Sequence, residues 1–151
     1  MADNRLSQRE IVTAAAGAIG EWLFAMLPIV VIMIVMAHLE RFSHMHQSPE
    51  WAFGASILAG QSIARFVAGI HSAGRLSLDR VLLGISAMLV ILVVPANIVL
   101  VLVVLAAENE PAHVSDLLAV LQILLFCVSS VVFVLVATFA HLWTRRNKQS
   151  H

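Results

Sequence analysis

Four long apolar runs limit what this chain can fold into: they cover residues 21–39, 51–70, 81–107 and 117–143. A helix that crosses the hydrocarbon core of a bilayer needs about 20 apolar residues, and each run is long enough. The connections between the second and third runs and between the third and fourth are short, and consecutive helices are expected to pack as antiparallel neighbours. The sequence therefore predicts an all-α polytopic membrane protein, a single domain of residues 1–151 in which four transmembrane helices form an antiparallel bundle.

Composition excludes most other classes of protein. Hydrophobic residues make up 60% of the 151 and charged residues 12%, with a mean hydropathy of +0.93, so the lipid bilayer is the expected solvent. The few Lys and Arg residues form no patch that would indicate direct nucleic-acid binding. No nucleophile–base pair, phosphate-binding loop or zinc motif is recognisable. We expect no enzymatic activity and no cofactor.

Basic residues fall in alternate flanks of the runs, which predicts the orientation in the membrane. The N-terminal flank, the second connection and the C-terminal flank contain Arg5, Arg9, Arg75, Arg80, Arg145, Arg146 and Lys148. The first connection contains only Arg41, and the third contains acids without a base. The predicted location is the bacterial inner (plasma) membrane, with multiple passes and both termini in the cytoplasm.

Two ionisable residues lie inside or at the edge of neighbouring runs. Arg65 is the only basic residue within a run, and Glu21 begins the first run at a similar depth. One interpretation is that Arg65 extends its guanidinium to the headgroups. The other is an ion pair between Glu21 and Arg65, since a charge in the membrane usually finds a partner. That pair would fix the first two helices or open when the protein changes state.

Small residues recur at every fourth position of the second run and predict a helix-packing face. They are Ala52, Ser56, Gly60, Ala64 and Ala68. A face without bulk allows another helix backbone to approach closely. Packing within the monomer is the preferred interpretation, and a subunit interface in a homo-oligomer is the alternative.

Three amide side chains in separate runs form a predicted polar band in the membrane. Gln61, Asn97 and Gln122 are expected in the middle to outer half of the bilayer. Interhelical hydrogen bonds are the preferred interpretation, and each contributes only about 0.6 to 2 kcal/mol. The alternative is that these amides line a path for ions in an oligomeric pore or channel.

Histidines at the end of the first run and in the connection after it are candidate metal ligands. His38, His44 and His46 lie close together in sequence, and imidazole binds zinc, nickel or copper. Their spacing matches no recognised motif, so exposure to water is the preferred interpretation. A periplasmic-side metal or pH sensor is the weaker alternative.

Short strings in the first half of the chain resemble a family of bacterial membrane proteins. The strings are Glu21-Trp22-Leu23-Phe24 before Pro28, then Pro49-Glu50-Trp51 and Gly60-Gln61-Ser62. They resemble small four-span proteins encoded in bacterial antiviral defence systems, such as the membrane subunits of Kiwa systems. The resemblance implies an oligomer in the inner membrane that detects phage attack and works with a soluble cytoplasmic protein. It assigns no role to an individual residue.

These patterns favour a non-enzymatic integral inner-membrane subunit or sensor. It is expected to be oligomeric and to pass a membrane event to a cytoplasmic partner. The oligomeric pore and the periplasmic-side metal or pH sensor are the alternatives.

Overall fold

Apolar residues form the helices along nearly their whole length, because a helix satisfies its own backbone hydrogen bonds where water is absent. The computed structural model describes residues 8–38, 48–73, 77–109 and 115–149, and in these ranges the chain is helical, with no strand. The helical elements are α1 (Gln8–His38), α2 (Glu50–Ala73), α3 (Leu78–Met88), η2 (Leu89–Val93), α4 (Val94–Asn109) and α5 (Asp116–Gln149). Because α3, η2 and α4 are continuous, these described ranges form four membrane-length helices, as the sequence predicts.

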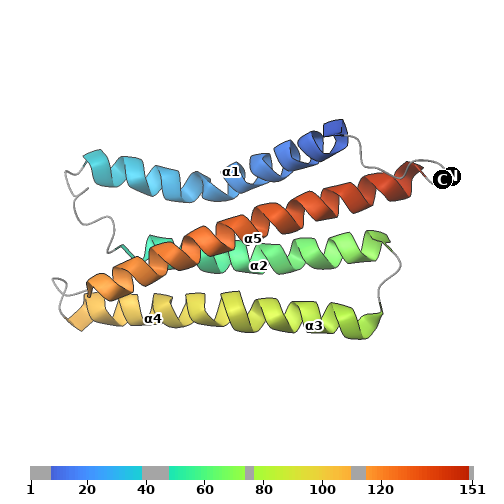
Figure 1. Cartoon of the computed structure of the whole chain (residues 1–151). Coiled ribbons are helices and arrows are strands. Elements are labelled where there is room, and N and C mark those ends of the chain that lie inside the picture. The colour runs from blue at the N-terminus through green and yellow to red at the C-terminus, as the bar shows by residue number, and fades with distance from the viewer. Residues whose placement is uncertain (1–7, 39–47, 74–76, 110–114, 150–151) are drawn as a thin grey trace.

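The third membrane helix contains one wide turn, η2, directly before Pro95. Proline has no backbone N–H, and its ring collides with the carbonyl group four residues earlier in a regular α-helix. In η2 the N–H of Val94 donates to the carbonyl oxygen of Leu89, five residues earlier. This π-type turn gives the proline ring room without ending the helix. Pro28 also lies inside a helix, α1, which is visibly curved (Figure 1).

The central helix of the bundle is α2. Its most extensive packing is against α5, and it also contacts η2 and α4. Of its most apolar 18 residues, 39% are buried, compared with 11% for α1. One core cluster joins α1, α2 and α5 through Ala18, Met26, Ile29, Leu58, Phe133 and Ala137. A second cluster joins α2 and α4 through Ala52, Val99 and Val103.

The first helix lies mainly on α5 and touches α2 only slightly. The expectation that consecutive helices are close neighbours is therefore wrong for α1 and α2. Large apolar side chains, among them Phe24, Ile34 and Val35, point away from the protein along α1. This outer surface is suited to contact with lipid.

The helices alternate in direction, so α1 begins, α2 ends, α3 begins and α5 ends at the same end of the bundle (Figure 1). Arg9 and Arg80 lie at this end, and so do the basic positions 145, 146 and 148 near the end of α5. We call it the basic end. Glu50 and Asp116 begin α2 and α5 at the opposite end.

Candidate functional site

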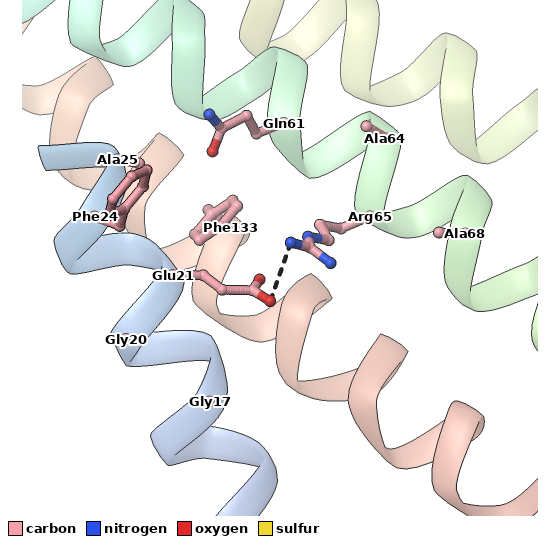
Figure 2. Close-up of a pocket in the computed structure, with 10 residues that line it drawn as sticks. All are labelled: Gly17, Gly20, Glu21, Phe24, Ala25, Gln61, Ala64, Arg65, Ala68 and Phe133. Atoms are coloured by element: carbon pink, nitrogen blue, oxygen red, sulfur yellow. Dashed lines mark ion pairs between the residues drawn. The ribbon is translucent and has the colours of Figure 1, made fainter. Parts of the chain in front are cut away.

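A groove lies between α1 and α2. It has a volume of about 730 Å³ and is open on one side. Its walls come from α1 and α2, and α5 closes its back (Figure 2). The lining residues are Gly17, Gly20, Glu21, Phe24 and Ala25 of α1, Gln61, Ala64, Arg65 and Ala68 of α2, and Phe133 of α5. The groove exists because α1 packs on α5 and leaves α2 partly uncovered.

Glu21 and Arg65 face each other across this groove. One guanidinium nitrogen of Arg65, Nη2, lies 3.0 Å from Oε1 of Glu21, and Figure 2 shows the two side chains pointing toward one another. The structure therefore contains the ion pair that is one of the two interpretations of the sequence. At 1.5 Å per residue, Glu21 lies about 26 Å along α1 from His38, and Arg65 lies about 22 Å along α2 from Glu50. His38 and Glu50 are at the end opposite the basic end. Both distances are shorter than the thickness of the hydrocarbon core, which is about 30 Å.

His141 of α5 is the third ionisable residue of this cluster. Its Nε2 lies 3.2 Å from the same oxygen of Glu21, although its orientation does not give an aligned hydrogen bond. The ring lies beside Gly17, where a Cβ atom would be 3.4 Å from Nε2, at the limit of ordinary van der Waals contact. We call Glu21, Arg65 and His141 the charged cluster, because it brings together one ionisable side chain from each of α1, α2 and α5.

The charged cluster leaves part of its hydrogen-bonding capacity unused. The second carboxylate oxygen of Glu21, Oε2, is buried and accepts no hydrogen bond from the described residues. About 44% of the Arg65 side chain and 28% of the Glu21 side chain are exposed. An ion pair in a medium of low dielectric constant is strongly attractive, but an unsatisfied buried oxygen is costly. The cluster therefore attaches α1 to α2 without being fully satisfied in this arrangement.

His141 was not predicted to belong to this site. Apart from Cys127, His141 is the only ionisable residue between positions 117 and 143, and it lies near the basic end like Glu21 and Arg65. That depth could have been used to predict that His141 lies near Glu21 and Arg65. The direction of its side chain could not be predicted from the sequence, because it depends on how α5 packs against α1 and α2.

The small-residue face of α2 is only partly used inside the monomer. Ala52 is fully buried and belongs to the core, and Ser56 is half-buried. Gly60, Ala64 and Ala68 are exposed, and a Cβ atom at Gly60 would meet nothing within 4 Å. Packing within the monomer, the preferred interpretation, is therefore wrong for these three residues. They lie on the side of α2 that α1 leaves uncovered.

The three amides lie in different surroundings. Gln122 is fully buried, whereas Gln61 is exposed and lines the groove. Asn97 is exposed, and its Nδ2 donates to the carbonyl oxygen of Val93 in the preceding turn, 2.8 Å away. The expected polar band is therefore not a shared network within the monomer. Asn97 satisfies its donor within its own helix, which sequence spacing alone does not reveal.

The candidate metal ligands are only partly described. His38 is exposed at the end of α1, and His44 and His46 lie outside the described residues. In the described ranges no three His, Cys, Asp or Glu side chains are grouped closely enough to hold a metal ion. Metal binding at the first connection stays an untested prediction.

No family model, no curated protein and no solved structure matches the chain. The groove and its charged cluster are therefore the features from which a function can be inferred.

Proposed function

We propose that this protein is a non-enzymatic subunit of the bacterial inner membrane that passes a membrane event to a cytoplasmic protein. The observation that carries the proposal is the charged cluster, in which Glu21 of α1 contacts Arg65 of α2 and His141 of α5. It attaches α1 at a groove where α1 otherwise makes little contact with α2. A change at the membrane that shifts α1 would break or remake this attachment.

The helix α1 has the properties of a movable element. It is the least buried of the membrane helices, and residues without bulk, Gly17 and Gly20, line its side of the groove. Packed helices often switch between discrete arrangements that differ by shifts of about 1–2 Å. The unsatisfied oxygen of Glu21 reduces the advantage of the closed arrangement, so a small difference in free energy would be enough to favour the other one.

Two of the three helices that meet at the charged cluster, α1 and α5, are long enough to extend into the cytoplasm. At 1.5 Å per residue, the 31 residues of α1 span about 46 Å and the 34 residues of α5 about 51 Å, compared with a hydrocarbon core of about 30 Å. We place the basic end in the cytoplasm, where short flanks rich in Lys and Arg normally lie. A shift of α1 in the membrane would then move surfaces that a cytoplasmic partner can contact.

The resemblance to membrane proteins of antiviral defence systems supplies a candidate for the membrane event, namely phage attack. It also fits the proposal that any chemistry belongs to a soluble partner. Homo-oligomerisation is part of the proposal because Gly60, which is exposed and lies outside the groove, leaves a position on the surface of α2 without bulk, where another helix can approach closely.

The test is to purify the tagged protein from its native host in a mild detergent and to identify what accompanies it by mass spectrometry. We expect a stoichiometric soluble protein and an oligomeric membrane component. The matched variants are Arg65→Gln and Arg80→Gln, since Arg80 lies at the same end but outside the groove. The response of the host to phage should be lost with Arg65→Gln and kept with Arg80→Gln.

A homo-oligomer without a companion would contradict this proposal and favour the pore. Gln61 is the amide that would then matter, because it faces the groove next to Arg65 (Figure 2). Purified protein in liposomes would pass ions, and Gln61→Leu would block the flux. Tight liposomes would exclude the pore.

A further inference from the structure

We propose that the groove between α1 and α2 binds one membrane phospholipid, with an acyl chain against the apolar wall and the phosphate on Arg65. This proposal does not depend on the signalling role described above, because a lipid site and a signal can each exist without the other. It names a ligand for a site that is otherwise described only by its lining.

The position of the groove determines what can fill it. It is open on one side. Its lining residues on α1 and α2 lie within the candidate membrane spans of these two helices. Its wall is largely apolar, with Phe24 76% exposed and Ala64 and Ala68 also exposed. An uncovered apolar surface at this depth is in contact with hydrocarbon, either from lipid or from another protein helix.

Arg65 distinguishes between these two occupants. A guanidinium has five N–H donors, and the one ion pair of Arg65 in the described residues uses Nη2 on Glu21. With 44% of the side chain exposed, the remaining donors face the groove or the surrounding membrane. Arg65 is eight residues from Ala73, the end of α2, which is about 12 Å along the helix. A guanidinium at that depth can reach the headgroup phosphates, and Arg binds phosphate through two parallel hydrogen bonds.

A second copy of this chain has no anion to offer at the same place. Residues 22–39, 51–70, 81–107 and 117–143 contain no Asp or Glu. Glu21 is the only acid at this depth, and it already contacts Arg65 within its own chain. A neighbouring copy would therefore cover the remaining N–H donors of Arg65 without offering them an anion, and buried donors without a partner are costly. A phospholipid supplies both the hydrocarbon for the wall and the anion for Arg65.

The phosphate and Glu21 would share one guanidinium. Because the carboxylate contacts Nη2, the other N–H groups are available to the phosphate without breaking the ion pair. His141 contacts the same oxygen of Glu21 as Arg65 does, so it does not use the N–H groups of Arg65 either. The bound lipid would then add to the attachment between α1 and α2, since it contacts both helices.

The experiment is a binding titration of the delipidated full-length protein in detergent, followed by native mass spectrometry. The probes are phosphatidylglycerol, a diacylglycerol with the same acyl chains, and inorganic phosphate as a competitor. We expect one site at which phosphatidylglycerol binds roughly 10- to 100-fold more tightly than diacylglycerol, the difference that hydrogen bonds to a charged group contribute. Inorganic phosphate at the same concentration should not compete.

Two pairs of variants test the two parts of the site. Arg65→Gln should remove the preference for phosphatidylglycerol, and Arg80→Gln should keep it. Gly20→Leu should weaken the binding of both lipids because the leucine side chain fills the groove. Gly60→Leu should leave their binding unchanged, since Gly60 does not line the groove. A Cβ atom at either glycine meets nothing within 4 Å, so neither leucine is expected to prevent folding.

Three outcomes would overturn the proposal. The first is equal binding of phosphatidylglycerol by the wild type, Arg65→Gln and Gly20→Leu. The second is displacement of the lipid by inorganic phosphate alone, which would indicate a site for a free anion. The third is a dimer that Gly20→Leu dissociates while lipid binding stays unchanged, which would assign the groove to a helix of a second copy.

Discussion

Glu21 is the residue of α1 that forms the ion pair with α2. Its Oε1 atom contacts both Arg65 and His141, so loss of the carboxylate would remove both contacts at once. Loss of Arg65 would leave a carboxylate without its main counter-charge in the membrane, which is unfavourable. The two residues should therefore behave as one unit in mutagenesis.

We predict that Glu21→Gln and Arg65→Gln each lower the free energy of unfolding by about 1 to 2 kcal/mol. The double variant should lose little more than the worse single variant, because either change already breaks the contact. The measurement is reversible unfolding in mixed micelles. Losses that add up would show that the two side chains act independently.

The contact between Glu21 and Arg65 was predictable because each residue is the only one of its charge at that depth in its run. His141 was not assigned to it, although its depth also matched. Depth along a helix follows from sequence, but the direction of a side chain depends on how the helix is rotated against its neighbours. The same reason applies to Asn97, which was expected in a shared band with Gln61 and Gln122. Its side chain is exposed on the surface of the bundle and donates a hydrogen bond within its own helix.

At the scale of elements, α2 has two faces of small residues, and the structure uses them differently. The face toward α5 includes the fully buried Ala59 and Ser62 and also Gly69, where a Cβ atom would lie 3.1 Å from the Cα atom of Ala140. The face with Gly60, Ala64 and Ala68 stays open. The sequence contains both series at similar spacing, so spacing alone does not reveal which one meets α5.

This difference predicts opposite responses to one added methyl group. Gly69→Ala should lower the free energy of unfolding by about 1–3 kcal/mol, because the backbone of α5 has to move. Gly60→Ala should leave it unchanged or raise it slightly, since alanine favours helix and nothing lies near the new atom. Unfolding in mixed micelles would measure both, and equal responses would contradict the close approach at Gly69.

At the scale of the whole molecule, the arrangement of four antiparallel membrane helices was predictable from the apolar runs. The helices extend beyond those runs, chiefly at the basic end, where α1 begins at Gln8 and α5 ends at Gln149. The runs mark only the part that hydrocarbon surrounds, whereas helix propensity continues into residues such as Gln8, Arg9 and Glu10. The position of α1 against α5, which opens the groove, left no signal in the sequence.

The orientation of the bundle gives a prediction about labelling. In a Cys127→Ser background, Ser115→Cys should react with a membrane-impermeant maleimide in intact cells, because Ser115 precedes α5 at the end opposite the basic end. Ser77→Cys, before α3 at the basic end, should react only after the membrane is opened. Both side chains are exposed, so accessibility in the membrane decides the result. The reverse pattern would place the basic end outside the cytoplasm.

The central claim is that the charged cluster determines where α1 lies against α2, and the most direct test is a distance between spin labels in liposomes. Labels introduced by Val12→Cys on α1 and Val67→Cys on α2, in the Cys127→Ser background, occupy exposed positions near the basic end. We predict a narrow distance distribution for the wild type and for the control Arg80→Gln, and a broader or shifted distribution for Arg65→Gln. The same narrow distribution in Arg65→Gln would contradict the claim, because α1 would then hold its position without the ion pair.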